Sequence, residues 1–157
     1  MQENELPGTP KELLRANLIL TSALISGVVI FSLLVLVLMH SMPKLADMDQ
    51  VFIVAVGGIA LVCFISALRI YNNRIKIIKE GNLTIYQKLI DHRTALITYF
   101  ALCEGAALFA VIGLMLTANY WFTLIIAVML LAMFMKIPLK ERVINDLELN
   151  WQEQQKL

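Results

Sequence analysis

Residues 93–117, RTALITYFALCEGAALFAVIGLMLT, contain one charged side chain beyond Arg93, the carboxylate of Glu104. From Ala95 to Thr117 this segment is long enough to cross the roughly 30 Å hydrocarbon core of a bilayer as a helix. Counted from Ala95, Glu104 lies about 14 Å along that helix, near the middle of the core. An ionisable side chain at such a depth is costly and rare, so Glu104 is a functional-site hypothesis by default.

The distribution of charge identifies the class of protein. The chain has 157 residues, of which 59% are hydrophobic, whereas about half of an ordinary soluble domain is apolar. Four apolar segments exclude all 13 Lys and Arg and 11 of the 12 Asp and Glu, and they cover residues 18–39, 51–68, 95–117 and 120–135. The sequence therefore predicts one membrane domain, an all-α integral membrane four-helix bundle.

The connection between the second and third spans sets the predicted orientation. It holds six basic residues against two acidic ones, so the positive-inside rule places it in the cytoplasm. Four spans then put both termini on the same side, N-in and C-in, in a bacterial inner membrane. We expect the basic residues of this connection to contact anionic lipid and no nucleic acid. They are Arg69, Arg74, Lys76, Lys79, Lys88 and Arg93.

Apolar residues persist through residues 69–93, which predicts a helical hairpin that extends the second and third spans beyond the membrane. Gly81-Asn82 is its obvious break, and Thr84 with Gln87 has the form of a capping box for the next helix. Thr9 and Glu12 have the same form at the start of the first helix. Because residues 117–119 leave almost no loop, the third and fourth spans should be antiparallel neighbours.

The tail, residues 139–157, places apolar residues at helical spacing among charges. We expect a cytoplasmic amphipathic helix that lies on the membrane or against the 69–93 hairpin. Its apolar positions are Val143, Ile144, Leu147 and Trp151.

Small residues in the first two spans predict close packing between helices. They are Ser22, Ala23, Ser26 and Gly27 in the first span and Gly57, Gly58 and Ala60 in the second.

The surroundings of Glu104 leave two alternatives for its depth. A hairpin count places Lys136 level with about residue 100. Either Lys136 marks the cytoplasmic boundary and Glu104 is only moderately deep, which we favour, or Lys136 is drawn inward as its ion-pair partner.

Without a cation beside it, Glu104 should be largely protonated. Four hydroxyl-bearing residues could hydrogen-bond its carboxyl group: Ser22, Ser26, Ser66 and Thr98.

Residues 101–109, ALCEGAALF, resemble the carboxylate helix of rotary-ATPase proteolipids, the membrane c or K subunits. In that family, such a stretch follows a basic cytoplasmic loop. The resemblance covers about 25 of the 157 residues, and it implies that Glu104 could carry a proton or a sodium ion. Proteolipid rings use an inner helix rich in glycine and alanine, whereas residues 51–68 are mostly bulky.

The whole chain is more similar to a group of uncharacterised small four-span bacterial inner-membrane proteins. The likeness rests on the EGxALF pattern at residues 104–109, the basic loop at 69–93 and the DLEL tail at 146–149. It implies the four-span topology and no activity.

No enzymatic constellation or metal-binding cluster is visible in the sequence, and no cofactor is implied. His40 and His92 are interpreted as loop residues at opposite membrane faces, and Cys63 and Cys103 as small apolar helix residues. We therefore expect a non-catalytic membrane protein that packs around a buried Glu104, as a small subunit of an unlike complex or as a self-associating homo-oligomer. The alternative is a proteolipid-like proton or cation carrier that uses Glu104.

Overall fold

The computed structural model of the chain describes residues 9–38, 49–155 and 157, and these form helices and turns without a strand. The helices are α1 (Pro10–Leu38), α2 (Asp49–Glu80), α3 (Ile85–Thr117), α4 (Trp121–Phe134), α5 (Lys140–Leu147) and α6 (Trp151–Gln154). The all-α prediction is confirmed. His40 and most of the expected connection between the first two spans lie outside the described residues.

Three of these helices are long and apolar enough to cross a membrane. α1, α2 and α3 contain 29, 32 and 33 residues, or about 44–50 Å at 1.5 Å per residue. They indicate a membrane-embedded protein. The predicted fourth span corresponds to α4, which has 14 residues and a length of about 21 Å, shorter than the hydrocarbon core.

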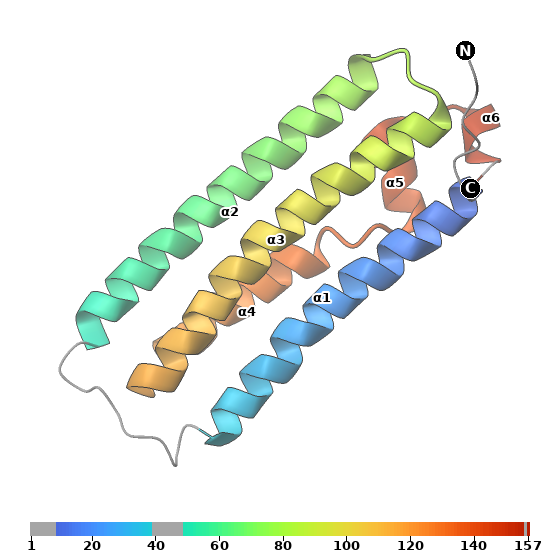
Figure 1. The fold of residues 1–157 in the computed structure, drawn as a ribbon. Helices are drawn as coiled ribbons and strands as arrows, with labels where there is room; N and C mark the ends of the chain where they lie inside the picture. Colours follow the sequence, from blue (N-terminus) through green and yellow to red (C-terminus); the bar gives the residue numbers. More distant parts are fainter. Residues whose placement is uncertain (1–8, 39–48, 156) are drawn as a thin grey trace.

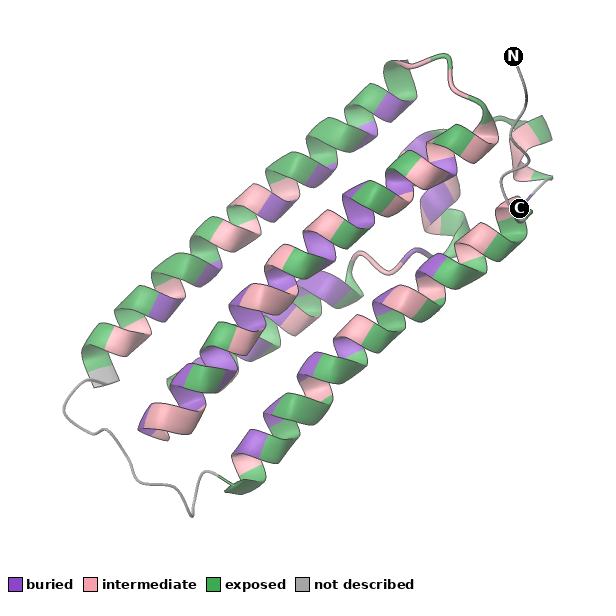
Figure 2. Cartoon of the chain, viewed as in Figure 1, coloured by how far each residue is buried: buried purple, intermediate pink, exposed green. Residues whose placement is uncertain are grey.

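α3 is the central helix of the bundle. α1 and α2 run along its two sides, α4 packs behind it, and α2 also contacts α5 (Figure 1). Buried residues therefore gather along α3, while α1 and α2 turn much of their apolar surface outward (Figure 2). Such an outward apolar surface suits contact with lipid, since lipid replaces water as the solvent there.

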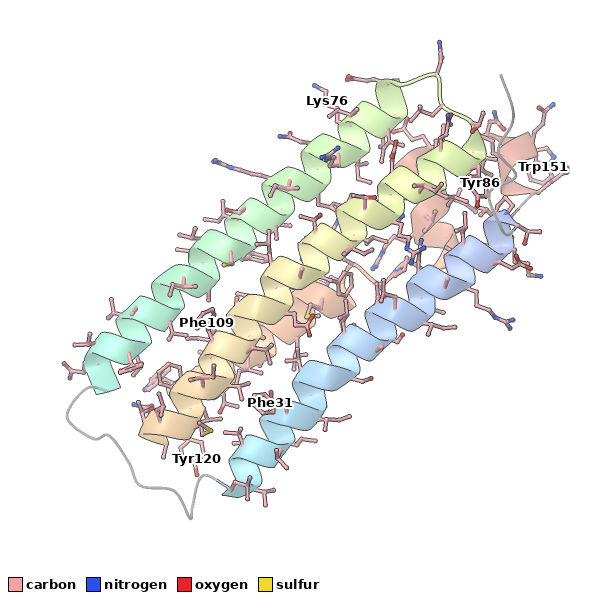
Figure 3. The ribbon with its side chains drawn as sticks, in the orientation of Figure 1. Phe31, Lys76, Tyr86, Phe109, Tyr120 and Trp151 are labelled. Atoms are coloured by element: carbon pink, nitrogen blue, oxygen red, sulfur yellow. The ribbon has the colours of Figure 1, made fainter. Side chains whose placement is uncertain are left out.

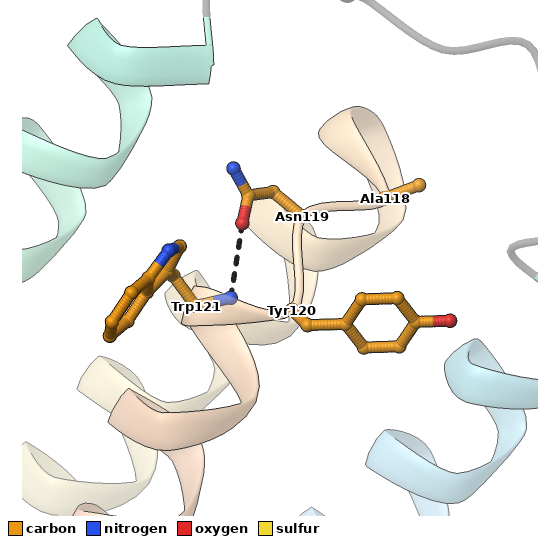
Figure 4. Close-up of a pocket in the computed structure, with 4 residues that line it drawn as sticks. All are labelled: Ala118, Asn119, Tyr120 and Trp121. Carbon is orange, nitrogen blue, oxygen red and sulfur yellow. Dashed lines mark hydrogen bonds between the residues drawn. The ribbon is translucent and has the colours of Figure 1, made fainter.

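A tight turn joins α3 to α4 and makes them antiparallel neighbours, as the sequence predicts. Ala118 adopts a left-handed conformation at φ 55°, and its backbone N–H donates to the carbonyl of Leu114 over 2.8 Å. The side-chain oxygen of Asn119 then accepts a hydrogen bond from the backbone N–H of Trp121 over 3.1 Å (Figure 4). Tyr120 and Trp121 are exposed beside this turn.

The 69–93 helical hairpin is also confirmed as local structure. α2 continues to Glu80 and α3 begins at Ile85. Thr84 caps α3, with reciprocal hydrogen bonds between its backbone and side chain and those of Gln87. We call the end of the bundle that holds this tip the hairpin end. The first turn of α1 lies at the same end, and so do α5 and α6 (Figure 1).

The tail differs from the single amphipathic helix expected at residues 139–157. Glu148 adopts a left-handed conformation at φ 48° and ends α5. α6 therefore starts in a new direction, with Asn150 as its cap. Val143 and Leu147 are buried as predicted, but Trp151 is 73% exposed and lies at the outer edge of the tail (Figure 3).

The small residues of the first two spans do not pack within the chain as predicted. Ser22, Ala23, Ser26 and Gly27 all face outward on α1. A Cβ atom added at Gly27, Gly57 or Gly58 would meet nothing within 4 Å. Of the positions expected in α2, Ala60 alone is buried. The face of a helix that a short residue occupies depends on where its neighbours lie, and the spacing of small residues does not reveal that.

Candidate functional site

Glu104 lies at the edge of the outward face of α3. One turn away on the same helix, Phe100 and Ala107 are buried, Leu108 is half-buried and Ala101 is exposed. The side chain of Glu104 is itself half-buried. A single copy of the chain therefore covers this carboxyl group only in part, which corrects the expectation of a fully buried glutamate.

Within the part of the chain that the structure describes, the carboxyl group of Glu104 has no hydrogen-bond or ion-pair partner. The Nζ atom of Lys136 lies 4.3 Å from the centre of the Tyr71 ring instead. Thr98 donates its hydroxyl to the carbonyl of Thr94, Ser66 is half-buried, and Ser22 and Ser26 face outward. None of the five partners proposed from the sequence reaches Glu104.

The position of Glu104 along the bundle follows from the α3–α4 pairing. The hydroxyl of Tyr99 donates to the carbonyl of Ala132 over 3.1 Å, so the last turn of α4 is level with the side chain of Tyr99. Glu104 lies five residues further along α3, about 7.5 Å beyond that level. Lys136 follows the end of α4 and is therefore more than a turn away from Glu104 along the bundle, and the depth of Glu104 in a membrane stays a prediction.

The outward surface beside Glu104 combines small and apolar side chains. We call it the Glu104 face and define it by Ile97, Ala101, Glu104, Gly105 and Ile112. Ala101 and Gly105 have the small-xxx-small spacing that allows two helix backbones to approach closely in lipid. A Cβ added at Gly105 would meet nothing within 4 Å, so the surface is open along this line.

A second polar site, which the sequence did not predict, joins four elements at the hairpin end. We call it the Tyr71 cluster: Tyr71 of α2, His92 and Tyr99 of α3, Lys136 after α4, and Asp146 of α5. The hydroxyl of Tyr71 donates to Oδ2 of Asp146 over 2.7 Å and lies 3.4 Å from Nε2 of His92. The ring of Tyr71 also makes an edge contact with the ring of Tyr99.

The donors and acceptors of this cluster assign the tautomer of His92. The single proton of the Tyr71 hydroxyl goes to Asp146, so at His92 the hydroxyl oxygen must accept, and Nε2 must carry the hydrogen. Nδ1 of His92 is then an acceptor, and it is buried with no hydrogen-bond partner among the described atoms.

Burial opposes the charged form of both aromatic groups in the cluster. It raises the pKa of the Tyr71 phenol, so this group stays protonated and keeps donating to Asp146. Burial is also the main reason why the pKa of His92 is lowered to about 4. The negative charge of Asp146 acts to raise this pKa, and the positive charge of Lys136 acts to lower it further. His92 is 1% exposed within α3, and its interpretation as a loop residue is wrong.

The DLEL segment of the tail alternates between polar contacts and core contacts with the hairpin. Asp146 binds Tyr71, and Glu148 forms a 2.7 Å ion pair with Lys79. Leu147 and Leu149 are buried in the apolar core of the hairpin end, at 1% and 4% exposure. Of the two locations expected for the tail, the structure therefore has the one against the hairpin.

This docking changes the interpretation of the basic residues in the hairpin. Lys79 pairs with Glu148, and Lys88 pairs with Glu153 over 2.9 Å, with both side chains of the second pair only 15% exposed. Lys76 pairs with Glu80 on the surface of α2. These three cations are engaged by carboxylates, and Lys88 is too enclosed to face a lipid headgroup.

We expect the Tyr71→Phe substitution to destabilise the docked tail by about 1–2 kcal/mol. The ring, with its contacts to Lys136 and Tyr99, remains, but the half-buried carboxylate of Asp146 loses its short hydrogen bond. Faster hydrogen exchange of the α5 amides would show this effect. Tyr120→Phe is the matched control, because Tyr120 is exposed at the α3–α4 turn. Equal exchange in both variants would contradict the role assigned to Tyr71.

The missed cluster had only a weak signal in the sequence. Tyr71 and Asp146 are 75 residues apart, and no spacing rule joins them. In the described ranges 9–38, 49–155 and 157, no three His, Cys, Asp or Glu residues are placed together to hold a metal ion.

Comparisons with known protein families, curated proteins and solved structures found no match to this chain.

Proposed function

We propose that the protein is a non-catalytic component of a bacterial inner membrane that associates through the Glu104 face with a second copy of itself. The observation that carries this proposal is the outward carboxyl group of Glu104, which has no partner in the described part of its own chain. A polar group in hydrocarbon costs several kcal/mol unless a hydrogen bond satisfies it. A facing helix that approaches across Ala101 and Gly105 would supply one.

The proposed topology has four crossings with both described chain ends in the cytoplasm. The start of α1 and the hairpin tip lie at the same end of the bundle, and the basic residues concentrate there. α4 is short for a crossing, and local thinning of the bilayer would accommodate it. Trp121 at its start and Lys136 just after its end suit the two interfaces.

The geometry of Glu104 also favours one rival function. A half-exposed carboxyl group on an outward face is accessible from the lipid, as an ion-carrying carboxylate must be. The rival is therefore a proton or sodium carrier of the proteolipid kind. Self-association needs a hydrogen-bonding side chain at residue 104, whereas ion carrying needs a titratable one.

Substitutions at Glu104 separate these functions. For self-association, Glu104→Gln should keep the oligomer, and Glu104→Leu should weaken it about tenfold, because an interhelical hydrogen bond in lipid contributes about 1–2 kcal/mol. Energy transfer between donor- and acceptor-labelled chains in vesicles measures the association. Selective carbodiimide labelling of Glu104, with protection by sodium or raised pH, together with unchanged association in Glu104→Leu, would favour the carrier and overturn the proposal.

A steric pair of variants tests the face independently of its charge. Gly105→Ile should weaken association because it fills the line of closest approach between helices. Gly58→Ile is the matched control, since a Cβ at either glycine meets nothing within 4 Å and we expect both variants to fold. Equal association of the two variants would show that the contact lies elsewhere.

A further inference from the structure

A basic hollow of about 580 Å³ lies at the hairpin end between the start of α1 and the start of α5. Lys11 and Arg15 line it from α1, and Lys140 lines it from the first turn of α5. Leu14, Leu18 and Leu139 form an apolar wall beside these cations. The hollow therefore offers positive charge and hydrocarbon surface to one ligand.

The electrostatics of the hollow favour an anion. Within the described residues, Lys11, Arg15 and Lys140 form no ion pair. Glu12 and Leu157 also line the hollow, and the side-chain carboxylate of Glu12 already accepts the backbone N–H of Thr9 over 2.9 Å in the α1 cap, so three cationic side chains face one anionic side chain. The hollow also lies at the N-termini of two helices, whose dipoles add partial positive charge.

The position of the hollow favours an anion that carries acyl chains. Leu18 is the first residue of the first proposed span, so Lys11 and Arg15 lie about one to two helical turns outside the hydrocarbon. That distance corresponds to the headgroup layer of a bilayer. From Leu18 the surface continues along α1 to Ile19, which is 64% exposed and faces the lipid.

We propose that this hollow binds the phosphate headgroup of an anionic phospholipid, with an acyl chain lying along the start of α1. The site is distinct from the basic residues of the hairpin, of which Lys79 and Lys88 are paired with the tail. Because one wall belongs to α1 and the other to α5, a bound lipid also connects the first helix to the docked tail. The proposal requires membrane embedding and is independent of self-association.

Native mass spectrometry of the full chain in gentle detergent tests this site, with phosphatidylglycerol as the probe and phosphatidylcholine as the neutral reference. Each basic residue near a lipid surface contributes about 1 kcal/mol, or about fivefold in affinity. The double variant Arg15→Gln/Lys140→Gln should therefore bind phosphatidylglycerol about twenty-fold more weakly. The charge-preserving variant Arg15→Lys/Lys140→Arg should bind it within about twofold of the parent and shows that folding is intact.

The matched control is the double variant Arg69→Gln/Arg74→Gln, which removes two exposed cations of the hairpin. An equal or larger loss of phosphatidylglycerol in this control would overturn the proposal in favour of diffuse attraction to the hairpin. Inorganic phosphate forms a second arm of the experiment. Little competition by phosphate at millimolar concentration is the expected result, whereas full displacement would reveal a simple anion site and overturn the assignment to lipid.

Discussion

Replacing Gly113 with leucine should destabilise the protein by about 2 kcal/mol and separate α4 from α3. A Cβ atom at Gly113 would lie 2.5–2.9 Å from three ring atoms of Phe122. That ring is fully buried and cannot swing aside. Overpacking in a filled core costs about 1–3 kcal/mol, and the remaining leucine atoms add to the clash. The higher helix propensity of leucine, about 1 kcal/mol, offsets only part of this cost.

The shift is measured by thermal unfolding in detergent, followed through tryptophan fluorescence, because Trp121 is the first residue of α4. Gly58→Leu is the matched control, since a Cβ at Gly58 meets nothing within 4 Å and the residue faces outward. It should leave the midpoint unchanged or raise it. A Gly113→Leu protein as stable as this control would show that α4 does not pack closely against Gly113.

The contrast between Gly113 and the other glycines shows which features the sequence could predict and which depend on the packing of the helices. Features that depend only on nearby residues were predicted correctly. Charge segregation located the apolar helices, and Thr84 with Gln87 located the start of α3. The role of a glycine in a helix, in contrast, could not be predicted, because its small size does not reveal whether it faces a neighbouring helix or the outside. Gly113 admits Phe122, while Gly27 and Gly58 face outward, and only the placement of neighbouring helices distinguishes them.

The candidate sites show the same division. Glu104 was found from the sequence because one charge in an apolar helix stands out against its surroundings. Its lack of a partner was not predictable, because the position of Lys136 depends on where α4 ends. The Tyr71 cluster was missed because its members come from four elements, and a tyrosine or histidine near a helix end is unremarkable in a sequence. The tail was misjudged at Trp151 because one left-handed residue, Glu148, redirects the chain.

Acidification should weaken the hairpin end through His92. Its pKa is about 4 in the folded protein and 6.5 in the unfolded reference, because burial disfavours the charged ring. Above pH 6.5 both states are neutral and His92 contributes no pH dependence. Between pH 6.5 and 4 the unfolded state binds a proton that the folded state does not, so stability falls as pH falls. The full loss is about 3 kcal/mol, at about 1.4 kcal/mol per pKa unit.

The geometry of the cluster gives this loss its physical cause. A proton on His92 would go to Nδ1, which is buried and has no acceptor among the described atoms. Of the charges around the ring, Asp146 attracts the imidazolium and Lys136 repels it. Asp146 is already bound to the hydroxyl of Tyr71, so it would have to leave that bond to serve His92 directly.

Thermal unfolding between pH 7.5 and 4.5, followed through tryptophan fluorescence, to which Trp151 in the tail contributes alongside Trp121, measures the effect. His92→Gln should flatten the pH dependence, because its amide can donate to Tyr71 without titrating. His40→Gln is the matched control, since it removes the other histidine of the chain, and it should keep the slope of the parent. A parent protein equally stable at pH 7.5 and 5, or a His92→Gln variant with an unchanged slope, would show that His92 is not buried as a neutral ring beneath the tail.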